Sequence, residues 1–299
     1  MSRVVFCSDI HYQYDKVGLA ALIDSIAAKN PDLVILGGDL ADCSNGYKTV
    51  LLAFRSEVHK VACLAGNHDL WSMYWRAYAQ DSKHGYDTLN CSYHIYDEFI
   101  PEICEDLGVT YLEKDNIVLG NWGIVGSLAW YDYSYKHASF NLMPDEYFYL
   151  QKKNFNNDGN FLNLSYNDVE FSKLIQDRFN QNIEKLHNDP EIKNIFVMTH
   201  VPVFEEAIGD QSNKNKSWLM GSSYFYNLTF GKNLTSDKIK GVISGHTHYG
   251  VQQDIVTPAG NPVRHLTSYS DYGSPTYFII DLDDSGTIKD ELVRTTFRR

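Results

Sequence analysis

Seven residues with metal-ligand side chains follow short apolar runs of the sequence. The runs that end near residues 8, 36, 65, 199 and 244 are each followed within three positions by aspartate, asparagine or histidine. Carboxylate and amide oxygens with imidazole nitrogens, and without any thiolate, suit Mn, Fe, Zn or Co better than Mg, Ca or a structural zinc. The set is too large for one ion. The candidate ligands are Asp9, His11, Asp39, Asn67, His200, His246 and His248.

Two pairs of these ligands are separated by a single residue. Asp9 and His11 flank Ile10, and His246 and His248 flank Thr247. If the strand conformation continues through each pair, both side chains point to the same side of the chain. Glycines stand before several ligands, where a backbone without a side chain lets the ligand approach an ion. These glycines are Gly37, Gly38, Gly66 and Gly245.

The edge of a sheet must position these ligands. Apolar runs at residues 3–8, 33–36 and 61–65 predict three strands, and helical spacing of apolar residues predicts helices over 19–30 and 47–58. Successive strand and helix units bring the carboxyl ends of their strands to one edge, where a site forms. Residues 166–188 predict a longer helix with a capping box of Ser165 and Asp168. Further strands are predicted within 109–126, at 194–199 and 241–244, and as a meander of short strands along 249–297.

The order of the ligand motifs resembles that of the calcineurin-like metallophosphoesterases. That family has D-x-H, GD, GNH[DE], an isolated His and G-H-x-H in this order, and every motif is complete here between residues 4 and about 250. The resemblance implies one domain over residues 1–299, an α/β fold. The implied fold is a four-layer α/β/β/α sandwich with two mixed sheets and a dinuclear metal site at the strand carboxyl ends. The meander along 249–297 is consistent with the second of these sheets. The motifs read Asp9-Ile10-His11, Gly38-Asp39, Gly66-Asn67-His68-Asp69, Thr199-His200 and Gly245-His246-Thr247-His248.

The resemblance also implies two divalent metal ions that share one carboxylate. Two ions roughly 3.5–4 Å apart can bind one phosphoryl group, and a hydroxide that bridges them attacks phosphorus in line with the leaving oxygen. Asp39 would be the shared ligand. The first ion would be held by Asp9, His11, Asp39 and His248, and the second by Asp39, Asn67, His200 and His246.

Two residues of the GNHD motif are expected to take part in catalysis. His68 matches the family residue that faces the leaving group, as a general acid or a hydrogen-bond donor to the transition state. Asp69 is expected to fix the orientation of the His68 ring and to raise its basicity. Asn67 and His68 are also expected to contact the substrate.

The sequence departs from two branches of the family. Protein Ser/Thr phosphatases extend the second motif to GDxxDRG, and that arginine is missing here. Purple acid phosphatases place a tyrosine where Asp42 stands. The chain therefore resembles the bacterial-type phosphohydrolases and phosphodiesterases, and the expected substrate is a small-molecule phosphate ester. Monoesters and diesters both stay open, although the missing arginine favours diesters, and Arg264 or Lys136 could supply a cation instead.

Two stretches do not fit the layered core and are expected to form a cap over the site. Residues 130–165 are rich in aromatic side chains, and residues 203–236 are polar. The aromatic residues, among them Trp130 and Tyr131, could stack against a planar leaving group. The favoured alternative is that they form the small core of the cap itself.

Charge limits the partners of the chain. It has 38 acidic and 26 basic residues and a formal net charge of −12, which argues against a nucleic-acid backbone or an anionic membrane as partner. The two ligand carboxylates, Asp9 and Asp39, balance only part of a nominal +4 from two divalent ions, so a small phosphate ester remains compatible with this charge.

The beginning of the chain and its cysteines indicate a cytoplasmic protein. No signal-peptide pattern precedes Asp9, and no apolar run approaches the length of a membrane span. The five cysteines include no C-x-x-C pair, which is typical of a reducing compartment.

A non-catalytic scaffold of the same fold, which binds a protein partner through the two insertions, is the alternative function. Such a scaffold usually lacks a ligand or the GNH histidine, and this chain retains both.

Overall fold

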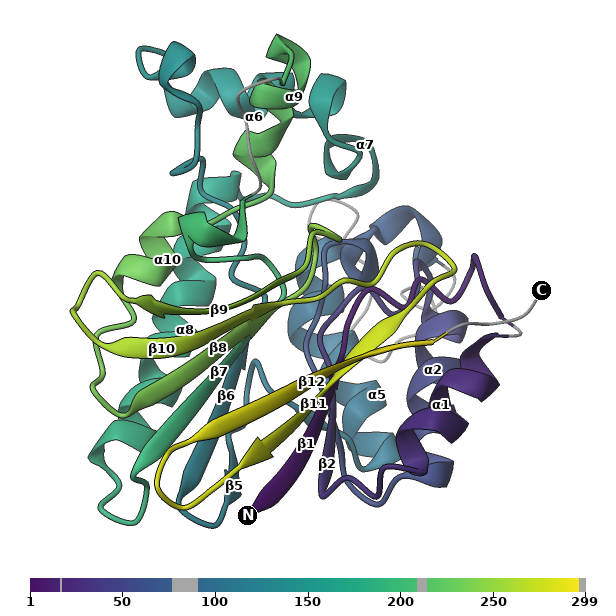
Figure 1. Cartoon of the computed structure of the whole chain (residues 1–299). Helices are drawn as coiled ribbons and strands as arrows, with labels where there is room; N and C mark the ends of the chain where they lie inside the picture. The colour runs from purple at the N-terminus through teal and green to yellow at the C-terminus, as the bar shows by residue number, and fades with distance from the viewer. Residues whose placement is uncertain (17, 77–90, 209–213, 296–299) are drawn as a thin grey trace.

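Two mixed sheets lie face to face with helices on their outer sides, which is the four-layer α/β/β/α arrangement expected from the resemblance (Figure 1). The structure is a computed structural model, and it describes residues 1–16, 18–76, 91–208 and 214–295. Each sheet has six strands.

The first sheet contains the strands predicted near the N-terminus. Its order is β12-β11-β1-β2-β3-β4; β1 to β4 are parallel, and β11 runs antiparallel to both β1 and β12. The carboxyl ends of β1, β2 and β3 therefore share one edge. The strands are β1 (Ser2–Cys7), β2 (Leu33–Leu36), β3 (Val61–Cys63), β4 (Thr110–Tyr111), β11 (Thr276–Leu282) and β12 (Ile288–Arg294).

The second sheet has the order β5-β6-β7-β8-β10-β9, with a parallel centre and an antiparallel strand at each edge. Assigning the whole tail 249–297 to this sheet is wrong, because β11 and β12 cross over to pair with β1 in the first sheet. The strands are β5 (Ile117–Leu119), β6 (Trp122–Ser127), β7 (Asn194–Thr199), β8 (Ile239–Ser244), β9 (Val251–Val256) and β10 (Pro262–Thr267).

Alternation along the strands fills three apolar layers. In β1, Val4 and Phe6 face the other sheet, whereas Val5 and Cys7 face the helices. The outer layers pack the first sheet against α1, α2 and α5, and the second against α8 and α10. These helices are α1 (Gly18–Ala27), α2 (Ser44–Glu57), α5 (Ile100–Leu107), α8 (Asp168–Asn188) and α10 (Leu228–Lys232).

The capping box of α8 lies two residues later than predicted. The Asn167 side chain accepts a hydrogen bond from the Glu170 amide at 2.9 Å, and the Glu170 carboxylate accepts one from the Asn167 amide at 3.0 Å. Ser165 and Asp168 do not form the box. Asp168 is buried instead and accepts hydrogen bonds from Trp130 Nε1 and Lys152 Nζ.

The two insertions form a group of short helices above the carboxyl edges of the sheets (Figure 1). The first supplies α6 (Asp145–Phe155) and α7 (Asp158–Phe161), and the second supplies α9 (Lys216–Gly221). Residues 209–213 of the second insertion lie outside the described residues.

The buried aromatic residues of the first insertion join the apolar cluster on the outer side of the first sheet. The Trp130 and Tyr131 side chains are fully buried, and their rings lie 4.3 Å apart. Trp130 and Tyr131 are therefore core residues, as the favoured alternative held, but their core is shared with the first sheet and α8 and is not the cap's own. Neither ring is free to stack against a ligand. The remaining short helical elements are η1 (His68–Leu70), η2 (Ser72–Tyr74), α4 (Cys91–His94), η3 (Ile95–Phe99), η4 (Ala138–Phe140), η5 (Glu205–Ala207) and η6 (Ser222–Tyr224).

Candidate metal centre

The loops that follow the strands hold the candidate ligands in a left-handed backbone conformation. The strands β1 and β8 end before the ligand pairs, so the expectation that strand geometry continues through Asp9 and His11 is wrong. A left-handed non-glycine residue costs about 1–3 kcal/mol and persists only where its surroundings impose it, typically at functional sites. Eight non-glycine residues of the described part have positive φ. Five are candidate ligands: Asp9 (57°), His11 (46°), Asp39 (54°), His246 (72°) and His248 (57°).

Two glycines let these loops touch each other. A Cβ atom on Gly66 would lie 2.2 Å from Asp39 Oδ1, and one on Gly245 would lie 2.0 Å from Ser8 Oγ and 2.7 Å from Asp9 Oδ2. Any side chain at either position would push the ligand loops apart. These glycines thus serve the approach of one loop to another.

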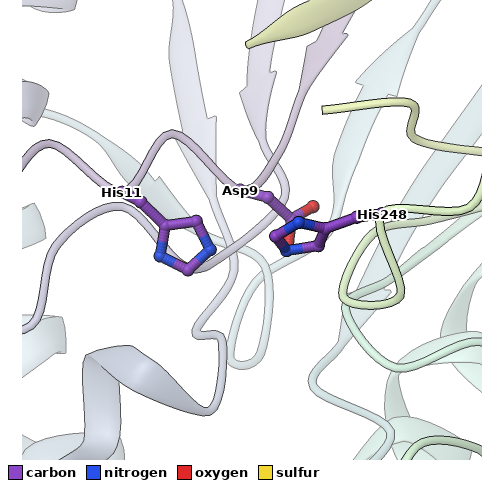
Figure 2. Close-up of side chains that lie close together, drawn as sticks. All are labelled: Asp9, His11 and His248. Atoms are coloured by element: carbon purple, nitrogen blue, oxygen red, sulfur yellow. The ribbon is translucent and has the colours of Figure 1, made fainter. Parts of the chain in front are cut away.

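Asp9, His11 and His248 form the first group of ligands. One ligand atom from each lies within 4.8 Å of the others. Figure 2 shows Asp9 and His11 on one loop and His248 on a second loop that reaches the same point. Asp9 and His11 are fully buried, and His248 Nε2 lies 3.6 Å from Asp9 Oδ1.

Asp39, His200 and His246 form the second group, by the same distance criterion. Asn67 belongs with them, because its Oδ1 lies 3.1 Å from His200 Nε2 and 2.9 Å from His246 Nδ1. Asp39 reaches both groups: its Oδ1 is 3.4 Å from His200 Nε2 and its Oδ2 is 3.8 Å from His11 Nε2. All seven candidate ligands therefore meet at one place.

Buried ring nitrogens without hydrogen-bond partners indicate that these groups fit metal ions. Both ring nitrogens of His11 and Nε2 of His246 are buried, and none has a partner within the described residues. Burying such groups without a partner is costly, and coordination to a cation would satisfy them. Burial lowers the pKa of His11 to about 3 and that of His246 well below its usual value, which keeps both imidazoles in the neutral form that binds metals.

His68 has a different carboxylate partner from the one expected. Its Nδ1 lies 3.1 Å from Asp42 Oδ1, and its ring stacks on Trp71 with centroids 3.7 Å apart. Burial opposes a positive charge on His68, but the carboxylates of Asp39 and Asp42 outweigh it and raise the pKa of the imidazole. The distance criterion also groups His68 with His11 and Asp39.

The Asp69 carboxylate contacts backbone amides and not the His68 ring. Its buried carboxylate accepts hydrogen bonds from the amides of Gly66 at 2.8 Å, Asp39 at 2.8 Å and Leu40 at 2.9 Å. The expectation that Asp69 orients His68 is thus not met, because these amides occupy both of its oxygens. Asp69 joins the loop after β2 to the loop after β3.

Comparison with known proteins decides the family. Residues 2–250 match the family described as calcineurin-like phosphoesterase. The chain belongs to this family. It is therefore a metal-dependent phosphoester hydrolase, and the resemblance drawn from its motifs is confirmed. No curated protein matches the sequence.

A solved structure shares the fold of this phosphoesterase, and two others are similar to it over most of its length. The phosphopantetheinyl hydrolase from Mycobacterium tuberculosis superposes with a TM-score of 0.64 at 17% identity, over 90% of this chain and 89% of that one. A 5'-nucleotidase precursor from Thermus thermophilus has a TM-score of 0.49 at 14% identity, over 98% of this chain and 54% of its own. A dimetal phosphatase from Danio rerio has a TM-score of 0.49 at 13% identity, over 99% of both chains. At these identities the similarity concerns the fold alone.

A pocket of about 390 Å³ opens onto the ligands of the phosphoesterase. The first insertion lines it with residues 153–158, and the second with Phe225. Lys153 is the one lysine or arginine in this lining, as far as the described residues go. The two cations proposed from the sequence lie elsewhere: Arg264 pairs with Asp290 at 2.6 Å, and Lys136 lies 3.5 Å from Asp145.

The loop between β10 and β11 adds two residues that sequence reasoning missed. Tyr272 lines the pocket, and its ring centroid lies 4.4 Å from that of His11 and 4.9 Å from that of His248. Asp271 Oδ1 lies 3.2 Å from His248 Nδ1 and can orient that ligand. A signal for these two residues was present in the sequence. They lie in a polar turn that follows a strand, and the other ligand loops also follow strands.

None of the helices in the described ranges is both long and apolar enough to cross a membrane.

Proposed function

We propose that this phosphoesterase hydrolyses a small-molecule phosphate ester with two divalent ions held by the seven candidate ligands. Such ions would neutralise the phosphoryl oxygens and activate water as the nucleophile. The donor set suits Mn, Fe, Zn or Co. Asp9, His11, Asp39 and His248 would hold the first ion, and Asp39, Asn67, His200 and His246 the second.

The observation that carries the proposal is the pair of ligand groups joined by Asp39. Each group offers carboxylate and imidazole atoms within 4.8 Å of one another, and three of the buried ring nitrogens have no other partner in the described part of the chain. A non-catalytic scaffold has no need for seven converging ligand-type side chains, five of them on a left-handed backbone that the fold must stabilise at a cost.

His68 would give a proton to the leaving oxygen. Its Nδ1 is engaged by Asp42, which leaves Nε2 as the nitrogen available to the substrate in the pocket. The raised pKa of His68 favours the protonated ring, which is the form that a general acid requires. Stacking on Trp71 limits rotation of the ring. Asn67 would contact the substrate beside it.

The two insertions would form a cap over the site within a single domain of residues 1–299. Residues 153–158 and Phe225 support this, because they line the pocket that contains Asp39 and Asn67. Lys153 would bind a negatively charged oxygen of the substrate, the role first considered for Arg264 and Lys136. A pocket of about 390 Å³ has the size of a small-molecule site.

We place the protein in the cytoplasm on the state of its cysteines. None of the five cysteines, all of which lie in the described ranges, forms a disulfide, and Cys63 Sγ lies 3.4 Å from Cys104 Sγ. An oxidising compartment would favour the disulfide at such a distance.

An assay with chromogenic esters tests the proposed activity. The protein loaded with Mn²⁺ is expected to hydrolyse p-nitrophenyl phosphate or bis(p-nitrophenyl) phosphate, to lose activity with a chelator and to regain it when Mn²⁺ is returned. The relative rates on the two esters separate monoesterase from diesterase activity. No turnover on either ester, with two ions bound by elemental analysis, would favour the scaffold.

A further inference from the structure

Asp158 of the first insertion is a buried carboxylate that contacts the metal loops directly. It stands at the start of α7 with no exposed surface. Its Oδ1 accepts hydrogen bonds from Asn67 Nδ2 at 2.9 Å and from Trp71 Nε1 at 2.8 Å. Its Oδ2 accepts one from the Tyr131 hydroxyl at 3.2 Å. Both oxygens of this one side chain are therefore occupied by specific donors.

The bond to Asn67 determines which end of that amide faces the proposed metal. The Asn67 oxygen lies 3.1 Å from His200 Nε2 and 2.9 Å from His246 Nδ1, whereas its nitrogen points to Asp158. The two ends of an amide have nearly the same shape, so packing alone does not select one. A carboxylate only accepts hydrogen bonds, so Asp158 selects the NH₂ end and turns the oxygen toward the imidazoles.

The bond to Trp71 extends the same control to the proposed proton donor. The Trp71 ring stacks on the His68 ring at 3.7 Å, with an angle of 30° between the planes. By fixing the indole N–H, Asp158 fixes the surface on which His68 rests. The Asp158 carboxylate of the cap therefore contacts both the candidate ligand Asn67 and Trp71, the residue that packs against His68.

We propose that Asp158 is a positioning residue, through which the cap holds Asn67 in its metal-binding orientation and Trp71 beneath His68. The inference rests on the metal assignment made under the proposed function. Residues 153–157, which line the pocket, immediately precede Asp158 in the chain. A shift of the cap against the sheets would thus disturb the metal centre through this carboxylate.

Two substitutions of Asp158 separate its hydrogen-bond role from its bulk. Asp158→Leu removes the acceptor and frees the Asn67 amide to flip. Mn²⁺ titration calorimetry should then show a loss of affinity of about 10- to 100-fold for one of the two ions, and kcat should fall with it. Asp158→Asn keeps an oxygen for Asn67 and Trp71 and offers its NH₂ to the Tyr131 oxygen, so both Mn²⁺ affinities should stay close to the parent. If the leucine variant does not fold, Asp158→Ser, which is too short to reach Asn67, takes its place.

Asp168, the first residue of α8 just after the insertion, provides a matched control. It is equally buried and also accepts hydrogen bonds from an indole, a tyrosine hydroxyl and a third donor, here Lys152. None of these three donors is a candidate ligand. Asp168→Leu should lower Tm but leave both Mn²⁺ affinities unchanged.

Two results would overturn the inference: parent-like Mn²⁺ affinities in the folded Asp158→Leu or Asp158→Ser variant, or an equal loss of affinity in Asp168→Leu. The titration needs no substrate. A protein that binds two ions with the predicted dependence on Asp158, yet hydrolyses no ester, would contradict the proposed function and leave this inference standing.

Discussion

Two aspartates near His68 have separate tasks at the residue scale. Asp42 contacts the imidazole, whereas Asp69 accepts backbone amides of the loop after β2. The GNHD motif identifies His68 and its neighbour from the sequence. It does not show that the loop after β2 folds back onto both residues, so the two tasks could not be assigned from spacing.

Removing the Asp42 carboxylate tests whether His68 acts as the acid. In Asp42→Asn the pKa of His68 should fall, so kcat for an alkyl phosphate, whose leaving group needs a proton, should drop about 10- to 100-fold. The loss on p-nitrophenyl phosphate should be smaller, because p-nitrophenolate leaves without a proton. Metal content, measured by elemental analysis, should not change. Equal losses on both esters would speak against the acid role.

Lys153 is the candidate for substrate recognition by charge. Lys153→Ala should raise KM about tenfold for an anionic ester, the value of one charge-assisted hydrogen bond, with Mn²⁺ affinity unchanged. Lys136→Ala is the matched control, because Lys136 belongs to the same insertion and pairs with Asp145 away from the pocket. If the two variants have the same KM in steady-state assays, Lys153 does not bind the substrate.

At the scale of elements, local patterns locate the strands but not their partners. Apolar runs correctly place β1, β2 and β3 because each strand is buried on both faces. The pairing of β11 with β1 joins Tyr277 to Cys7, two residues far apart in the chain. The periodicity of apolar residues contains no information on such a distant contact. This explains why β11 and β12 were expected in the second sheet although they belong to the first.

The ligand loops show a similar limit. Residue types pointed to all seven candidate ligands. The left-handed backbone that presents five of them arises from contacts between loops and could not be inferred from one loop alone.

A methyl group at Gly66 would test this contact between loops. In Gly66→Ala the new Cβ would collide with the Asp39 backbone nitrogen, at 2.2 Å, and displace the shared ligand. We expect Mn²⁺ titration to show weaker binding, together with a lower Tm. Gly221→Ala, whose Cβ would lie 3.4 Å from its nearest neighbour, should change neither by much. If Gly66→Ala binds Mn²⁺ as tightly as the parent protein, close contact between the loops after β2 and β3 is not needed for metal binding.

For the whole molecule, the formal charge of −12 coexists with a site built to hold cations. Surface carboxylates are screened over about 8 Å at physiological ionic strength, so the electrostatic potential at the metal centre is set mainly by its own ligands.

The sequence predicted both insertions. Their aromatic content drew attention to Trp130 and Tyr131, but the first insertion lines the pocket with residues 153–158, which are polar apart from Phe155.

Glu113 should make the stability of the whole chain depend on pH. Burial raises the pKa of this carboxyl group from 4.5 to about 7 in the folded state. Between these values the folded chain keeps a proton that the unfolded chain has lost. The free energy of unfolding should therefore fall by about 3 kcal/mol as pH rises from 4.5 to 7 and then level off.

Urea unfolding at pH 5 and pH 8 measures this dependence. Glu113→Gln, which keeps a hydrogen-bond acceptor for the Tyr96 hydroxyl without a titrating group, should lose this part of the pH dependence. A variant as pH-sensitive as the parent would show that other groups are responsible.

The central claim is that two ions share Asp39, and the electron paramagnetic resonance spectrum of the Mn²⁺-loaded protein tests it most directly. Ions roughly 3.5–4 Å apart should give the spectrum of an exchange-coupled pair. His248→Ala, which removes a ligand of the first ion only, should convert it into the six-line spectrum of isolated Mn²⁺. A six-line spectrum from the fully loaded parent protein, with two ions bound, would contradict a shared ligand and with it the account of this site.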